Sequence, residues 1–125
     1  MLIRIAFTIL VLSIPISAHA DTLSSSQIKQ TIIGKRVLLA TRYGVEFPLV
    51  YNNNGTVKGD GTGTGLGSFL APKETGKWWI KSNELCQQFP TWYDGEIQCF
   101  TLEVVGQGKL KWQTRDGRSG IARVN

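Results

Sequence analysis

The chain has 125 residues and a formal net charge of +5, and 42% of its residues are hydrophobic, which suits a single domain with a modest core. Its one histidine is His19 and its two cysteines are Cys86 and Cys99. Two cysteines are too few for a structural zinc site, and we expect neither a metal ion nor a cofactor. In an oxidising compartment the two cysteines instead favour one structural disulfide, Cys86–Cys99.

Residues 1–20 have the pattern of a signal peptide. Arg4 gives a positive start, residues 5–16 form an apolar run, and residues 17–20 provide small side chains for cleavage. The alternative is a membrane anchor, but the run is shorter than the roughly 20 residues that a spanning helix needs. We expect cleavage after Ala20, which leaves residues 21–125 as one exported, soluble domain, periplasmic or secreted. Without Arg4 and His19 this domain has a net charge of +4 and no imidazole for Ser-His-Asp or Cys-His catalysis.

The first predicted element is a short helix. Ser24, Ser25 and Ser26 provide its cap, residues 27–33 continue it, and Gly34 ends it. Its apolar stripe comprises Leu23, Ile28 and Ile32. After Gly34, short β-branched and aromatic runs alternate with turn residues, which is typical of an all-β domain.

Residues 36–42 and 45–51 predict two strands joined at Tyr43-Gly44. Pairing about this turn forms one apolar face, with Ala40 opposite Phe47 and Leu38 opposite Leu49. Pro48 cannot donate a backbone hydrogen bond, which indicates an unpaired side or a bulge. Asn54-Gly55 then predicts a hairpin turn into residues 56–59, and residues 68–71 predict a further strand.

The next strand, residues 77–81, alternates its side chains between two faces. Trp78 and Ile80 point to the core, while Lys77, Trp79 and Lys81 point out. Residues 85–90 and 96–105 follow as a hairpin in which Cys86 faces Cys99, with the disulfide on the outer face. Counting from this pair predicts two pairs on the core face, Leu85 with Phe100 and Gln87 with Gln98, joined there by Phe89, Leu102 and Val104.

The last hairpin comprises residues 109–114 and 118–124, with a turn at Asp116-Gly117. Leu110 and Trp112 point inward, and a bulge at Gly120 lets Ala122 and Val124 join them. With about eight strands connected by short turns, the economical fold is a closed antiparallel barrel, because closure leaves no exposed strand edge. A two-sheet β-sandwich is the alternative.

Aromatic and basic side chains are the candidate binding residues. Trp92 and Tyr93 lie where the disulfide hairpin turns, and they either contact a ligand or partner or fold back to plug the barrel. Trp79, which points outward, could also contact a ligand or partner. Basic residues crowd the last hairpin and could form a cationic surface for nucleic acid, anionic glycan or lipid headgroups: Lys109, Lys111, Arg115, Arg118 and Arg123. A net charge of +4 is mild, however, so the nucleic-acid signal is weak and surface solvation is the simpler interpretation.

No motif points to an enzyme. The glycine-rich residues 59–67 lack the GxGxxG and GxxxxGKS/T spacings and indicate an inter-strand loop. Asp94 and Glu96, with Asp60, are the carboxylates that a hydrolase would use, although solvated turn acids are commoner at such positions. Ser68 has no visible base partner. The sequon at residues 54–56 matches an N-glycosylation acceptor and, more simply, a hairpin turn.

Three short motifs remain: YNNNGTVKG, TGKWWI with its G-x-W strand, and ELC followed by a second cysteine on the next strand. Together they resemble small exported bacterial proteins of unknown function. The resemblance covers most of residues 34–124 and implies a lipocalin-like barrel and a periplasmic location, with no catalytic residues. We therefore expect a non-catalytic binding module for an unknown ligand. The alternatives are an interaction or inhibitor module acting through the hairpin tip, and a carboxylate-dependent hydrolase.

Overall fold

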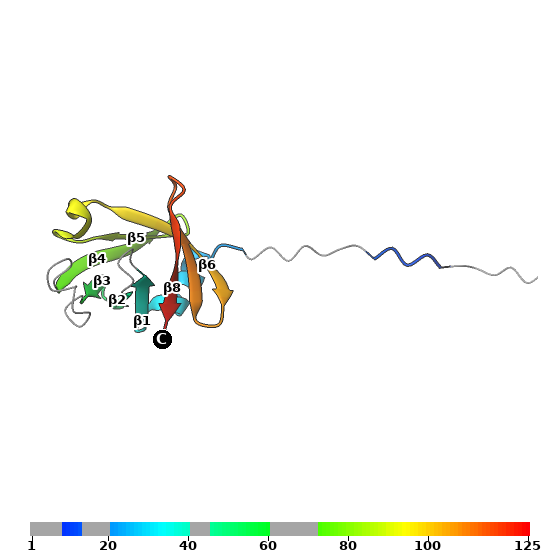
Figure 1. Cartoon of the computed structure of the whole chain (residues 1–125), viewed down its shortest axis with the longest axis horizontal. Coiled ribbons are helices and arrows are strands. Elements are labelled where there is room, and N and C mark those ends of the chain that lie inside the picture. Colours follow the sequence, from blue (N-terminus) through cyan, green and yellow to red (C-terminus); the bar gives the residue numbers. More distant parts are fainter. Residues whose placement is uncertain (1–8, 14–20, 41–45, 61–72) are drawn as a thin grey trace, which may run out of the picture.

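Antiparallel strands form a closed barrel in the computed structural model, which describes residues 9–13, 21–40, 46–60 and 73–125 (Figure 1). Each of the eight described strands pairs with its neighbours in sequence, and β8 pairs with β1 to close the barrel. The predicted all-β barrel is therefore confirmed, and the sandwich alternative is wrong. The elements are α1 (Ser25–Ile32), β1 (Arg36–Ala40), β2 (Glu46–Tyr51), β3 (Thr56–Gly59), β4 (Glu74–Lys81), β5 (Glu84–Gln88), the 3-10 turn η2 (Trp92–Gly95), β6 (Gln98–Gly106), β7 (Lys109–Gln113) and β8 (Ser119–Val124).

The predicted helix covers one end of the barrel. Ser24 and Gln27 form a capping box, in which each side chain accepts a hydrogen bond from the other residue's backbone N–H. Ile28 and Ile32 point into the core and are fully buried. The backbone of Ser25 donates to the Asn83 side chain at the β4–β5 turn, so α1 is tied to the barrel end where β5 begins.

The register between β1 and β2 differs from the predicted one by one residue. Phe47 pairs with Leu39 rather than Ala40, and Leu49 pairs with Val37 rather than Leu38. The run Val37-Leu38-Leu39 is apolar at every position, so hydrophobicity alone does not identify the inward face, and a one-residue slip exchanges the faces. The β1–β2 register is unbroken at Pro48, which pairs with Leu38, so the bulge is wrong. On the β3 side the Pro48 carbonyl accepts from the backbone N–H of Asp60 at 3.2 Å, so this side lacks only the bond that a proline, having no N–H, cannot donate.

The predicted bulge at Gly120 is wrong. Gly120 pairs directly with Trp112 in an unbroken β7–β8 register. The glycine is needed because a Cβ there would lie 2.6 Å from Cζ2 of Trp112. An irregularity occurs instead between Val104 and Gly106 on β6. Val104, expected in the core, lies beside it with 49% of its surface exposed.

The disulfide hairpin has the predicted pairing. Cys86 is bonded to Cys99 directly across β5 and β6, at a Cα–Cα distance of 4.1 Å. Leu85 pairs with Phe100 and Gln87 with Gln98, which places these side chains on the core face. The alternation of strand side chains then sets the bridge on the outer face.

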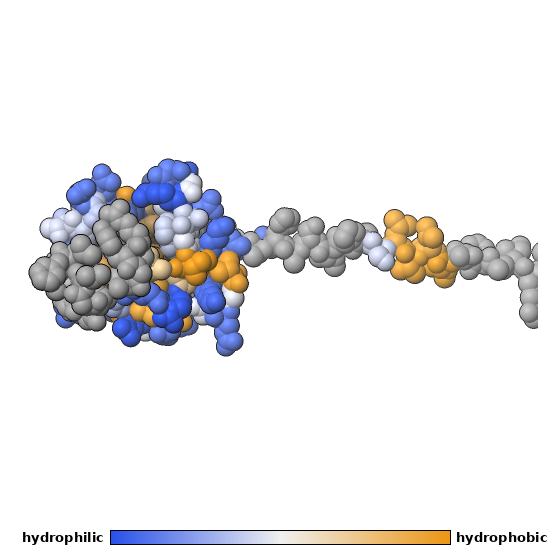
Figure 2. Space-filling model, viewed as in Figure 1, coloured by the Kyte–Doolittle hydropathy of each residue, from blue (hydrophilic) through white to orange (hydrophobic). Residues whose placement is uncertain are grey.

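Residues 9–13 lie apart from the barrel in Figure 1, and the side chains of Ile9 to Leu12 are exposed. In Figure 2 they form a hydrophobic segment outside the barrel, and the coloured part of the barrel surface in this view is mostly hydrophilic with smaller hydrophobic patches. Among the described residues, no helix is long and apolar enough to cross a membrane.

Candidate functional site: a cavity in the barrel lumen

The barrel encloses a cavity of about 530 Å³. Its wall comes from inward positions of β1, β2, β5, β6, β7 and β8 and is mainly apolar; it includes Val37, Leu49, Leu85, Leu102, Leu110 and Ala122. Ile32 of α1 also lines it, at the end that the helix covers. A volume of this size is in the usual range for small-molecule sites, about 300–1,000 Å³.

The rim opposite α1 carries the polar side chains. Thr91, Tyr93 and Asp94 contribute from η2 and the residue before it, and Thr114 and Arg118 contribute from the β7–β8 turn. These residues lie at the strand ends remote from the helix, because β5 runs away from Asn83 toward η2. A molecule in the lumen would therefore meet apolar side chains along its body and polar side chains at the rim.

A short chain of hydrogen bonds crosses the inner wall. The Tyr51 hydroxyl donates to Oε1 of Gln87 at 2.6 Å, and Nε2 of Gln87 donates to Oε1 of Gln98 at 3.4 Å. Gln87 is only 1% exposed, so these bonds satisfy polar groups that would otherwise be buried without a partner. Burial, with a smaller electrostatic effect from Tyr93, raises the pKa of Tyr51 well above its usual value, so the phenol keeps its proton.

Trp92 is folded back into the barrel. Its ring is buried against Phe89, with centroids 4.8 Å apart, and faces Phe47 at 6.2 Å. Gly59 makes room for it, because a Cβ at residue 59 would lie 2.3 Å from the indole. Glu74 fixes the turn by accepting hydrogen bonds from the backbone and hydroxyl of Thr91, at 2.5 and 2.6 Å. Of the two fates predicted for the tip, the structure shows the plug for Trp92.

The other two predicted ligand-binding aromatics lie elsewhere. Tyr93 follows Trp92 with a left-handed backbone, remains 43% exposed and lines the lumen rim. Its pKa is raised by partial desolvation of the hydroxyl. Trp79 lies on the outer face opposite Cys86 and is half-buried, so it does not line the lumen. Only Trp92 and Tyr93 are therefore brought together at the cavity.

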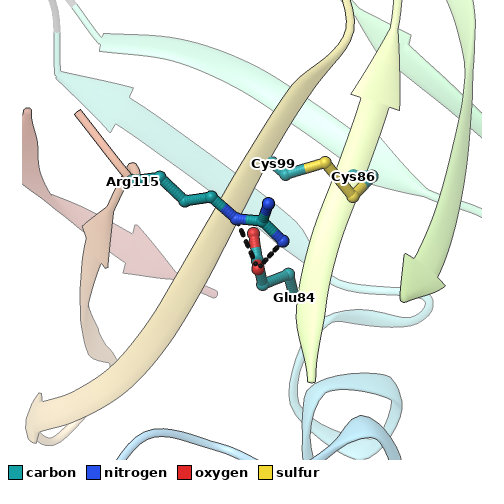
Figure 3. Close-up of a disulfide and its surroundings, with 4 residues drawn as sticks. All are labelled: Glu84, Cys86, Cys99 and Arg115. Atoms are coloured by element: carbon teal, nitrogen blue, oxygen red, sulfur yellow. Dashed lines mark hydrogen bonds and ion pairs between the residues drawn. A yellow bond between two sulfur atoms is a disulfide. The ribbon is translucent and has the colours of Figure 1, made fainter. Parts of the chain in front are cut away.

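A second depression of about 550 Å³ lies on the outer surface beside the disulfide. Arg115 reaches across β6 and donates to Glu84 through Nε and Nη2, at 3.1 and 2.8 Å (Figure 3). Asp94 and Glu96 line the same depression. They share it with Asp116, which accepts from Arg118, so two of its four carboxylates already have guanidinium partners.

The predicted basic surface is divided by carboxylates. Arg115, Arg118 and Arg123 pair with Glu84, Asp116 and Glu46 respectively. Lys109 and Lys111 have no salt bridge among the described residues, and Lys111 is partly buried. Local pairing reduces the positive field that a polyanion would meet.

Several sequence features carry no site in the described structure. Asn54 accepts hydrogen bonds from the backbone and hydroxyl of Thr56, so the sequon is a hairpin turn. Tyr43-Gly44, the predicted strand at 68–71 and most of the glycine-rich loop (residues 61–67) lie outside the described residues, as does Ser68.

Sequence reasoning did not identify the polar residues of the lumen. The strand register predicts that Gln87 and Gln98 lie on the core face, but no motif indicates a role for them. The available signal was their direct pairing on that face, because a buried amide requires hydrogen-bond partners.

The fold and the cavity define a small closed β-barrel with a mainly apolar lumen and a polar rim. No family model matches the chain, and comparisons with curated proteins and with solved structures find no significant similarity.

Proposed function

We propose that this protein is a non-catalytic binding module that takes a small, mainly apolar ligand into the barrel lumen, in the manner of lipocalin-like barrels. The observation that carries the proposal is the cavity of about 530 Å³, whose wall is mainly apolar. Transfer of an apolar ligand from water to such a wall is favourable by roughly 25 cal/mol for each Å² buried. The ligand would enter at the rim beside η2, because α1 covers the opposite end.

We also propose that the protein works outside the cytoplasm, in a bacterial periplasm or as a secreted protein. Support comes from the leader pattern in residues 1–20, with cleavage after Ala20, and from the disulfide, since such bonds persist in oxidising compartments. Mass spectrometry of the protein recovered from a periplasmic extract tests both points. A chain beginning at Asp21 is expected, and an intact leader on protein retained in the cytoplasm would refute the proposal.

A cavity-filling variant tests the binding function. Ala122 lines the lumen, so Ala122→Leu places three additional carbon atoms in the space that a ligand would occupy. Its neighbour Ile121 is on the outer face and exposed, which makes Ile121→Leu a matched control on the same strand. The probe is N-phenyl-1-naphthylamine, a neutral apolar dye that fluoresces in apolar surroundings, and thermal melts establish that both variants are folded.

We expect wild type and Ile121→Leu to bind the dye equally, and Ala122→Leu to bind it at least about tenfold more weakly, a difference of about 1.4 kcal/mol. Equal binding by all three proteins would place the dye outside the lumen and refute the proposal. Absence of dye binding by the folded wild type would also refute it.

The second candidate is an interaction module at the hairpin tip. Ile97 is 58% exposed beside half-exposed Tyr93, and such apolar side chains can anchor a protein partner. Ile97→Ser, which leaves the lumen unchanged, is the variant that separates this function from ligand binding. It is expected to abolish capture of a partner and to leave dye binding unchanged; a partner captured equally by the variant would refute this candidate.

A further inference from the structure

The hydrogen-bond chain of the lumen wall leaves amide donors that have no acceptor among the described residues. Oε1 of Gln87 accepts from the Tyr51 hydroxyl, and Oε1 of Gln98 accepts from Gln87. The amide group of Gln98 has two N–H bonds, and among the described residues neither has an acceptor. Gln98 lines the cavity and also borders the outer depression; because its amide oxygen bonds inward Gln87, its two N–H donors lie beside the surface that a ligand would contact.

We propose that the ligand is an apolar molecule bearing a hydrogen-bond acceptor, such as a carbonyl, ester or ether oxygen, which the Gln98 amide recognises. This inference rests on the proposed function and specifies the ligand's chemistry. Each of the two amide oxygens already accepts one hydrogen bond, so a donor on the ligand would have to share that oxygen, whereas an acceptor on the ligand would meet Gln98 donors that have no acceptor among the described residues. A pure hydrocarbon would leave the Gln98 donors without a partner, at a cost in affinity.

The hydrogen-bond chain orients the Gln98 amide. Among the described residues the Tyr51 hydroxyl has one hydrogen bond, which it donates to Oε1 of Gln87. This fixes the Gln87 oxygen toward Tyr51 and its nitrogen toward Gln98. Gln98 must then present its oxygen to Gln87, which leaves its nitrogen free. The orientation of the Gln98 amide therefore depends on Tyr51, at the other end of the hydrogen-bond chain.

The indole of Trp112 provides a second unsatisfied donor on the same wall. Its Nε1 is buried and has no hydrogen-bond partner in the described part of the protein. The ring lies against Gly120 and meets Phe100 edge to face, with centroids 5.6 Å apart. Protein atoms cover the N–H in this arrangement, so a ligand reaches it only if the ring tilts. An acceptor in the lumen would favour that tilt by satisfying the N–H.

Three molecules of similar size and different hydrogen-bonding capacity test the inference. The first is 2-tetralone, which only accepts hydrogen bonds, and the second is protonated 2-aminotetralin, which only donates them. The third is tetralin, which neither accepts nor donates hydrogen bonds. Each is titrated against the dye-loaded protein, and the measured quantity is the ratio of two affinities within one protein. The variants are Gln98→Leu, Gln98→Glu and, as an outer-face control, Gln113→Leu, since Gln113 is exposed on β7.

We expect wild type and Gln113→Leu to prefer 2-tetralone over tetralin by about fivefold, the effect of one net hydrogen bond. Gln98→Leu should reduce this ratio to about one, and Gln98→Glu, which replaces the donors by acceptors, should favour 2-aminotetralin. Equal affinities in wild type, or a preference that survives Gln98→Leu, would overturn the inference while leaving the binding function intact. If the dye itself does not bind the wild type, the proposed function is what fails.

Discussion

Removing the disulfide should destabilise the barrel by about 3 kcal/mol. Cys86 and Cys99 are 13 positions apart, and closing a loop of that length lowers the entropy of the unfolded chain by an amount equivalent to about 3 kcal/mol in the chain-entropy model. The double variant Cys86→Ala/Cys99→Ala removes the bond and leaves no unpaired thiol. Because the loop contains η2, the segment whose conformational freedom increases is the one that forms the rim.

Urea unfolding monitored by tryptophan fluorescence measures the loss. The midpoint should fall, and the slope of the free energy of unfolding against urea should rise, because the unfolded chain is more expanded without the cross-link. In a thermal melt the same loss corresponds to a fall of roughly 12–24 °C, at 4–8 °C for each kcal/mol. Thr101→Ala, a similar truncation two residues from Cys99 on the same face of β6, is the control and should cause a much smaller change.

A loss below about 1 kcal/mol, with an unchanged slope, would refute this reasoning, because it would mean that the bridge does not restrict the unfolded chain. The ion pair between Glu84 and Arg115 cannot substitute for it. Arg115 is 78% exposed, and exposed pairs typically contribute about 0–1 kcal/mol.

Two further predictions concern the rim and its charges. Gly59→Ala should displace the Trp92 ring, which near-ultraviolet circular dichroism detects, and should destabilise the protein by about 1–3 kcal/mol. Gly106→Ala is the control and should have little effect, because its new Cβ would lie 3.6 Å from Lys109. An unchanged aromatic signal in Gly59→Ala would contradict the packing of Trp92 against Gly59. Acidification should destabilise the protein, because hydrogen bonds hold the pKa values of three carboxyl groups, Glu46, Glu74 and Asp116, below their usual values. Glu46 accepts from Arg123, and Asp116 accepts from Thr114 and Arg118. At Glu74 desolvation raises the pKa, but the hydrogen bonds from Thr91 and Trp92 together lower it by more. A depressed folded-state pKa contributes stability above the unfolded pKa and loses it as the pH falls through the folded value, so urea midpoints should fall below about pH 4. The urea midpoint of Glu74→Gln should fall less on acidification than that of wild type. An identical fall would show that Glu74 does not contribute to the pH dependence.

The barrel could be predicted from local patterns because strand alternation and turn chemistry act over a few residues. Trp78 and Ile80 alternate with Lys77, Trp79 and Lys81, and Asn54-Gly55 marks a turn, so nearby residues encode both the strand faces and the hairpins. The Cys86–Cys99 pair then fixes one register outright. Between β1 and β2 no such marker exists, and three consecutive apolar residues leave two registers that differ by one position. The β1–β2 error follows directly from that degeneracy.

The lumen could not be predicted in the same way, because an internal cavity depends on volumes summed across strands far apart in sequence. Gly59 shows the difficulty: within β3 it is a weak strand residue, and its role emerges only where the Trp92 ring, 33 positions later, packs against it. Gln87 and Gln98 are similar, since a glutamine on an inward face is costly unless Tyr51 from β2 reaches it. Both cases join residues that no short motif contains. Some residues on a core face suit an apolar core poorly, such as a glycine within a strand or two glutamines paired across strands. Such residues are therefore the best indication in the sequence of a binding cavity in a small barrel.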